Sequence, residues 1–163
     1  EKRLAEARGP VIGFIETVLD GRLRKIEVLH TLRGLRPADL RDVVPLEVGP
    51  LTVRVLSPQQ LLKAKIANSA TLDQQDRNDV KHLRMILLCL REFIADFAAG
   101  VSTGNIAPRT LVNLLEETRS TISSAQASRA ASLWKIDFSG VWPIDRLSAL
   151  HDDKVNRFLA RRL

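Results

Sequence analysis

Side chains suited to phosphate or metal chemistry occur at two places in the first half of the sequence. The first is Glu27, a carboxylate inside an alternating polar and apolar run, residues 24–28, that is typical of a half-buried strand. The second is a basic and acidic set made of Lys65 and the later pair Arg77 and Asp79. Each also has an ordinary explanation. Glu27 can pair with a cation on the surface, the stem of Lys65 can cover the core, and Arg77 and Asp79 can begin a helix.

Common catalytic and cofactor-binding motifs are absent from the sequence. His30, His82 and His151 lie far apart, and none has a second His or Cys at helical spacing, so no local metal site is indicated. There is no nucleophile elbow, P-loop or G-x-G-x-x-G fingerprint. Residues 100–104 begin and end with glycine but lack a lysine, and we expect them to be an interhelical loop. Cys89 is the only cysteine, which excludes an intramolecular disulfide, and its leucine neighbours predict a buried, inert thiol.

The elements that would position these residues differ between the two halves of the chain. Before residue 57, apolar and β-branched runs flank an Asp-Gly and a Gly-Pro turn, which predicts two β-hairpins. The expected strands are residues 11–19, 23–29, 43–48 and 51–56, with a helical turn or loop at 37–41.

At Ser57 the apolar period changes from two to 3.6, which predicts helices for the rest of the chain. Ser57 is placed to cap the first helix, and Gly100 is expected to end the longest one. Trp134 and Trp142 are expected to hold the helical end of the chain to the core. The expected helices are residues 58–68, residues 77–99, a stretch from Pro108 that reaches Leu133, and a last stretch from Pro143.

The pattern as a whole predicts an α+β fold. We expect a small mixed or antiparallel sheet from the two hairpins in the N-terminal half, followed by a helical C-terminal half. In terms of domains, residues 1–76 form an α+β region and residues 77–163 form a helical region packed on it.

Two short stretches carry a resemblance to a known family. A strand, then LSPQQLLKAKI at residues 56–66, then a loop, then RNDVKHL at residues 77–83, resembles the second half of nucleotidyltransferase-fold proteins of the polymerase-β type. The chain is similar in particular to small bacterial members found in abortive-infection and toxin–antitoxin systems and among aminoglycoside-type nucleotidyltransferases. The resemblance covers about the first half of the chain, and residues 104–163 match nothing.

The resemblance implies transfer of a nucleotidyl group from an NTP to a hydroxyl acceptor, with Mg²⁺ as cofactor. It assigns Glu27 as a catalytic carboxylate and metal ligand, and places Lys65, Arg77 and Asp79 at the nucleotide. The family also uses a Gly-Ser turn and two carboxylates one residue apart on a strand, because two metal ions need converging oxygen ligands. This sequence has neither, and family order would place both before Glu1. Two explanations follow: a trimmed piece of an active enzyme, or a degenerate relative.

Two further hypotheses remain beside the enzyme. The domain can be a non-catalytic binding module that keeps the fold and holds a protein or RNA partner. It can also form a homo-oligomer through apolar surface on the helical half, at residues 77–99 and 111–133.

Composition excludes several classes of protein. With 163 residues, 45% hydrophobic and 27% charged, the chain is neither a disordered tail, a collagen-like repeat nor a disulfide scaffold. Residues 1–81 hold 14 basic and 11 acidic side chains and residues 82–163 hold 11 and 8, so each half contributes +3 to the net charge of +6. Arginine outnumbers lysine 18 to 7, which slightly favours polyanionic partners. The single cysteine and the short apolar runs predict a cytoplasmic protein without membrane segments.

Overall fold

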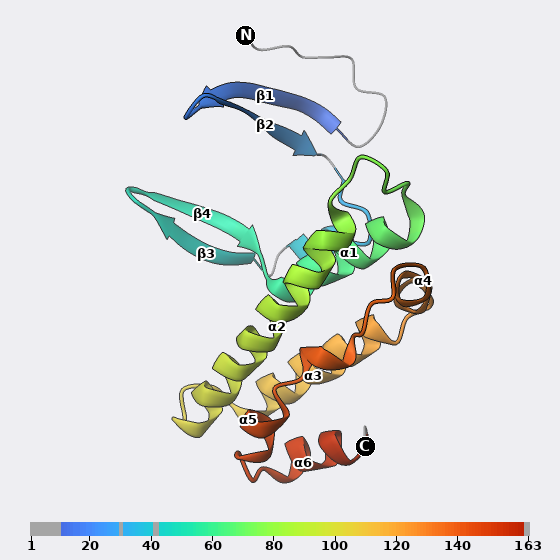
Figure 1. The fold of residues 1–163 in the computed structure, drawn as a ribbon. Helices are drawn as coiled ribbons and strands as arrows, with labels where there is room; N and C mark the ends of the chain where they lie inside the picture. The colour runs from blue at the N-terminus through green and yellow to red at the C-terminus, as the bar shows by residue number, and fades with distance from the viewer. Residues whose placement is uncertain (1–10, 30, 41–42, 162–163) are drawn as a thin grey trace.

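The fold is α+β, as expected, with two antiparallel hairpins in the N-terminal half and helices in the rest (Figure 1). The computed structural model describes residues 11–29, 31–40 and 43–161. Each hairpin forms a two-stranded sheet of its own among these residues. The elements in chain order are β1 (Val11–Leu19), β2 (Arg22–Leu29), η1 (Pro37–Leu40), β3 (Val43–Val48), β4 (Leu51–Leu56), α1 (Pro58–Thr71), α2 (Asp79–Ser102), α3 (Pro108–Ile122), α4 (Ala125–Trp134), η2 (Ser139–Val141), α5 (Ile144–Ser148) and α6 (Asp153–Ala160).

The first hairpin turns at Asp20 and Gly21, whose φ angles are both positive, 51° and 70°. A two-residue turn with two positive φ angles matches the right-handed twist of paired strands, which is why Asp-Gly predicts a hairpin. The register pairs Leu19 with Arg22 and continues along the strands until Glu27 lies opposite Phe14.

The second hairpin turns at Gly49, with φ of 58°, and Pro50. Its register pairs Val48 with Leu51, Leu46 with Val53 and Pro45 with Arg54. Because side chains alternate across a strand, the hydrophobic pairs share one face of this hairpin. That face is largely exposed: the exposed residues on it are Val44, Leu46, Val48, Leu51 and Val53.

Helix α1 begins as expected and ends later than expected. The Ser57 hydroxyl accepts a hydrogen bond from the Gln60 backbone N–H, and the Gln60 side-chain oxygen accepts one from the Ser57 N–H, which forms a capping box. The helix continues past Asn68 to Thr71. The polar residues of this last turn fit a helix because Ser69 is fully buried, and its hydroxyl donates to the Lys65 carbonyl at 2.8 Å.

Helix α2 forms the central axis of the helical half and buries Leu83, Leu87, Leu90 and Ile94 along one face. It begins at Asp79 and continues through Gly100 to Ser102, so the expected end at Gly100 is wrong. A Cβ at position 100 would lie 2.6 Å from the Ile106 side chain. Glycine therefore serves here to let the next loop pack closely on the helix.

Cys89 is exposed, and the expected burial of its thiol is wrong. It lies on the same helix as the buried Leu87 and Leu90, within an apolar run whose members do not all face inward. Met85 and Leu88 are also exposed, at 52% and 66%. Consecutive residues of a helix point in different directions around its axis, so only some residues of this apolar run can reach the core.

The stretch expected as one helix from Pro108 to Leu133 is divided in two. Helix α3 ends at Ile122, and the Ser124 hydroxyl accepts a hydrogen bond from the Ala127 N–H at 3.2 Å, which caps α4. A capping serine offers the backbone an alternative to continued helix. Two short helices, α5 and α6, follow Pro143.

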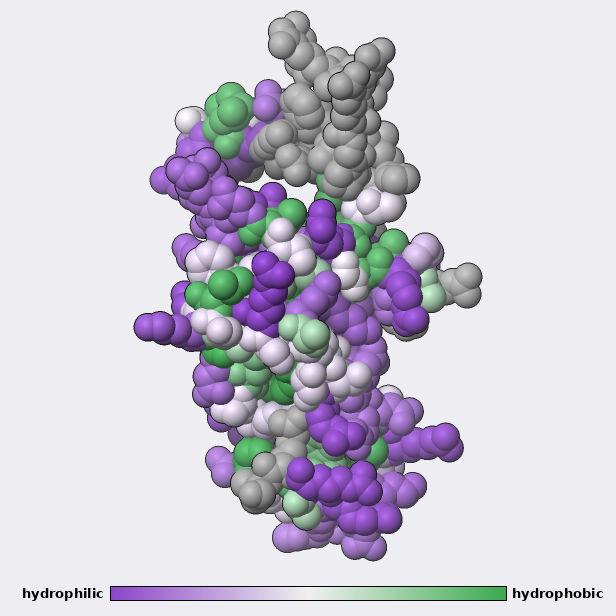
Figure 2. Space-filling model, turned by 90° about the vertical axis from the view of Figure 1, so that its right-hand side faces the viewer, coloured by the Kyte–Doolittle hydropathy of each residue, from purple (hydrophilic) through white to green (hydrophobic). Residues whose placement is uncertain are grey.

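Both tryptophans pack as expected. Trp142 is 5% exposed and packs edge-to-face against Phe158 of α6, with ring centroids 5.2 Å apart. The Trp134 ring N–H donates to the Ser69 carbonyl at 2.8 Å, which joins α4 to α1. On the face of the molecule shown in Figure 2, hydrophobic residues are scattered among hydrophilic ones. No helix among the described residues is long and apolar enough to cross a membrane.

Candidate functional site

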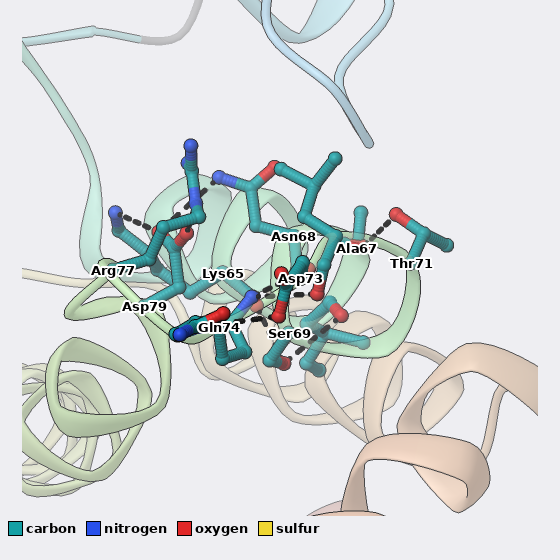
Figure 3. Close-up of polar contacts among 12 residues, drawn as sticks. Lys65, Ala67, Asn68, Ser69, Thr71, Asp73, Gln74, Arg77 and Asp79 are labelled. Carbon is teal, nitrogen blue, oxygen red and sulfur yellow. Dashed lines mark hydrogen bonds and ion pairs between the residues drawn. The ribbon is translucent and has the colours of Figure 1, made fainter.

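Three of the four predicted site residues meet where α1 is followed by α2. Lys65 lies on α1, Arg77 lies in the connecting loop, and Asp79 is the first residue of α2. The Lys65 Nζ lies 2.8 Å from Asp79 Oδ1, and the Arg77 Nε lies 2.6 Å from Asp79 Oδ2 (Figure 3). Asn68 Nδ2 donates to Asp79 Oδ1 at 3.3 Å. These four residues are called the Asp79 cluster below.

The loop between α1 and α2 is held in place by its own hydrogen bonds. The Gln74 side chain donates to the Asn68 carbonyl at 3.2 Å and to the Leu72 carbonyl at 3.0 Å, which closes the C-terminal end of α1. One residue beyond Asn68, the Ser69 carbonyl is held by Trp134. The last turn of α1, which carries Asn68, is therefore fixed from both sides.

Asp79 is a buried carboxylate kept charged by its neighbours. Its side chain is only 4% exposed. Burial acts to raise the pKa of Asp79, but hydrogen bonds from Lys65, Arg77 and Asn68 outweigh it, and the pKa lies below its ordinary value. Its place at the N-terminal end of α2, where the helix dipole is positive, favours the same charged form.

The cluster carries one more positive than negative charge and remains open to solvent on its basic side. The side chains of Lys65 and Arg77 are 24% and 46% exposed. Arg77 engages Asp79 through Nε, and its terminal nitrogens point away from the carboxylate (Figure 3). A guanidinium in this pose retains donors in a planar fork that suits a phosphate oxygen.

The fourth predicted residue, Glu27, is placed only through its backbone. It lies on β2 opposite Phe14, and its side chain is outside the part of the structure that is described. Within the described part, no group of three His, Cys, Asp or Glu residues could hold a metal ion. Asp79 does not fit Mg²⁺ either, because two cationic side chains already occupy its oxygens.

Sequence reasoning missed Asn68, although a signal for it existed. Asn68 follows Lys65 by three residues, a spacing that places two side chains on one face of a helix. A polar residue at that spacing from a predicted phosphate ligand was a candidate for the same site.

A second ion-pair group was also missed. Lys63 Nζ lies 2.6 Å from Glu117 Oε1 and 3.4 Å from Asp39 Oδ1, so it joins α1 to α3 and to η1. Its partners lie 54 and 24 positions away in the sequence, where no local periodicity links them. The sequence alone held no signal for this group.

Comparison with known proteins yields one partial similarity. Acetaldehyde dehydrogenase 2 of Azotobacter vinelandii (strain DJ) is 30% identical to the chain over 124 residues, which is 74% of this chain. The chain spans 39% of the length of that protein. No family model matches the sequence, and no solved structure gives a significant match.

Proposed function

We propose that the chain is a nucleotidyltransferase-like domain, either a piece of an active enzyme or a degenerate relative. In its complete form it would transfer a nucleotidyl group from an NTP to a hydroxyl acceptor. One observation supports this proposal above the others. Lys65, Arg77 and Asp79, the residues that the resemblance places at the nucleotide, come from separate elements and lie in one cluster.

In this proposal the basic residues bind phosphate and Asp79 holds them in position. The carboxylate takes one hydrogen bond from Lys65 and one from Arg77, which orders two long side chains that would otherwise lose rotamer freedom on binding. Their remaining N–H groups stay free to bind phosphate oxygens of a nucleotide. The resemblance assigns Mg²⁺ to Glu27, and the Asp79 cluster does not fit a divalent cation.

We expect the chain by itself to bind nucleotide without turnover, because the sequence lacks the Gly-Ser turn and the paired carboxylates. The test titrates a fluorescent ATP analogue against the wild type and the variants Lys65→Gln and Arg77→Gln. Each variant should weaken binding about tenfold, the loss of one charge-assisted hydrogen bond. Lys81→Gln, which removes an exposed charge from the same region of α2, is the matched control and should bind like the wild type.

Equal affinity in all four proteins would refute the phosphate-binding role of the cluster. A second arm incubates the chain with labelled NTP and Mg²⁺. Strong labelling of the protein or of an added acceptor would refute the expected lack of turnover.

A second candidate is a non-catalytic module that binds a protein partner. The hydrophobic face of the β3–β4 hairpin supports it, because a two-stranded hairpin with an exposed apolar face is marginally stable by itself. Leu46→Asp should abolish capture of such a partner, whereas Arg54→Asp on the opposite face, across from Pro45, should not. For an RNA partner, affinity should instead fall steeply with salt concentration. Salt-independent binding would argue against RNA.

Two other activities have less support. The similarity to an acetaldehyde dehydrogenase covers 39% of that protein, and the sequence lacks a glycine-rich dinucleotide fingerprint, so we do not propose dehydrogenation. Self-association through the helical half stays a prediction, which light scattering coupled to size-exclusion chromatography would test.

A further inference from the structure

The segment that joins the two hairpins, residues 31–40, is folded against helix α1. Its backbone makes two tight turns, with Leu35 N–H donating to the Leu32 carbonyl at 3.1 Å and Asp39 N–H donating to the Arg36 carbonyl at 2.9 Å. It ends in the short helix η1, which lies beside α1 in Figure 1. Residues 31–40 therefore have a defined path over the helix.

Asp39 anchors the end of this segment to α1. Its carboxylate accepts from the Arg36 backbone N–H at 2.8 Å and from Lys63 Nζ at 3.4 Å, and its carbonyl accepts from the Gln60 side chain. The side chain is 11% exposed. The backbone hydrogen bond from Arg36, together with the charged side chains of Arg36 and Lys63, lowers the pKa of Asp39 to about 2, so this anchor is charged at any ordinary pH.

Gly34 anchors the middle of the segment by close packing. Its φ is +84°, and a Cβ there would lie 2.7 Å from the Ala67 Cβ and 2.8 Å from the Lys63 carbonyl oxygen. Only glycine lets the backbone lie this close to the helix. Lys63 and Ala67 lie on the same stretch of α1 as Lys65 and Asn68 of the Asp79 cluster.

The first hairpin has few contacts with the rest of the described chain. Within the described part of the chain, neither β1 nor β2 packs extensively against any helix. Strand β2 ends at Leu29, five positions before Gly34. Gly34 and Asp39 are therefore the described contacts with α1 that lie nearest to β2 along the chain.

We propose that Gly34 and Asp39 are positioning residues that hold β2 in a fixed orientation to α1, and thereby set Glu27 relative to Lys65. The role assigned to Glu27 and Lys65 rests on the proposed function, but the fixed orientation does not. Both residues act through the connecting segment and neither touches the nucleotide.

The orientation can be measured by pulsed electron–electron distance spectroscopy between two spin labels. Cys89 is exposed on α2 and supplies the first label site, and Thr17→Cys on β1 supplies the second. A reference pair joins Cys89 to Glu47→Cys on the other hairpin. Gly34→Ala and Asp39→Asn are each introduced into both labelled proteins, and circular dichroism verifies that the variants fold.

Gly21→Ala is the matched control for Gly34→Ala. Both glycines have positive φ, but a Cβ at position 21 meets nothing within 4 Å, so this variant has the backbone strain without the clash. We expect the Cys89–Thr17Cys distance distribution to broaden about twofold in Gly34→Ala and Asp39→Asn, because a released hairpin samples more orientations. It should keep its width in Gly21→Ala, and the reference pair should not change.

A distribution that is already broad in the wild type, or one that stays narrow in both variants, would overturn the proposal. The link to the site is tested separately, with the fluorescent ATP analogue in the presence and absence of Mg²⁺. Gly34→Ala should reduce the gain in affinity from Mg²⁺ as Glu27→Gln does, and should leave the Mg²⁺-free affinity unchanged. If the distance distribution broadens but Mg²⁺ still raises the nucleotide affinity as much as in the wild type, the link to Glu27 is refuted. The positioning of β2 would then still be established.

Discussion

Replacing Asp79 by Asn tests whether the Asp79 cluster is a true buried ion-pair group. The change keeps the size of the side chain and one oxygen acceptor, and it removes the charge that faces Lys65 and Arg77. The variant leaves two cations beside a neutral amide at a position that is 4% exposed. The free energy of unfolding should therefore fall.

The size of the loss follows from the exposure of the partners. Removing one member of a fully buried ion pair costs about 3–5 kcal/mol, because the other charge is left without compensation. Lys65 and Arg77 are partly exposed and can recover water, so the loss should be nearer the value of hydrogen bonds to a charged group, about 1.5–3 kcal/mol. In urea this corresponds to a midpoint lower by about 1 M.

The pH dependence gives a second check on the same reasoning. Because the pKa of Asp79 in the folded protein lies below the ordinary value of 3.8, its contribution to stability is complete well above pH 3.8. That contribution is lost as the pH falls through the folded pKa. The difference in stability between the wild type and Asp79→Asn should therefore be constant from pH 7 to about pH 5 and decrease below pH 3.8.

The assay is urea unfolding followed by tryptophan fluorescence at several pH values. Asp76→Asn is the control, because Asp76 is an exposed carboxylate in the adjoining loop and should change stability by less than about 0.5 kcal/mol. Equal stability of the two variants would refute the cluster as a source of stability. A loss in Asp79→Asn that is independent of pH would refute the charge of Asp79 as its cause.

Three other predictions concern the scaffold. Leu90→Ala should cost about 2–5 kcal/mol in urea unfolding because Leu90 is fully buried, whereas Leu88→Ala on the exposed face should cost little; comparable losses would contradict the assigned faces of α2. Ser57→Ala should lower stability by about 1 kcal/mol through loss of the capping box, and an unchanged unfolding midpoint would refute that role. Cys89 should react with Ellman's reagent in the folded protein at nearly the rate of the unfolded chain, and protection until denaturant is added would contradict its exposure.

Local patterns predicted most of the secondary structure. The alternating runs beside Asp20-Gly21 and Gly49-Pro50 marked both hairpins because turn geometry and strand period are set by adjacent residues. The failures arose where tertiary packing decides. Gly100 lies inside a helix and leaves room for the Ile106 side chain, and Cys89 faces outward although its neighbours in sequence are apolar.

The site was predictable in part. The resemblance named Lys65, Arg77 and Asp79, and the ion pairs between them are 2.6 and 2.8 Å long. No pattern along the chain could show that a carboxylate at the start of α2 reaches back to α1, since the path of the intervening loop decides it. Asn68 was missed although its helical spacing from Lys65 was visible in the sequence.

The pairing of Pro45 with Arg54 makes the two edges of the second hairpin unequal. Proline has no N–H to donate, so it is accommodated where the backbone groups of a pair point away from the partner strand. The outer edge of β3 therefore lacks a donor at this point, while Arg54 presents both its N–H and its carbonyl at the outer edge of β4. The two edges therefore differ in how well they can pair with a strand of another polypeptide. Such a strand can add to the sheet beside β4, whereas the missing donor of Pro45 disfavours pairing beside β3.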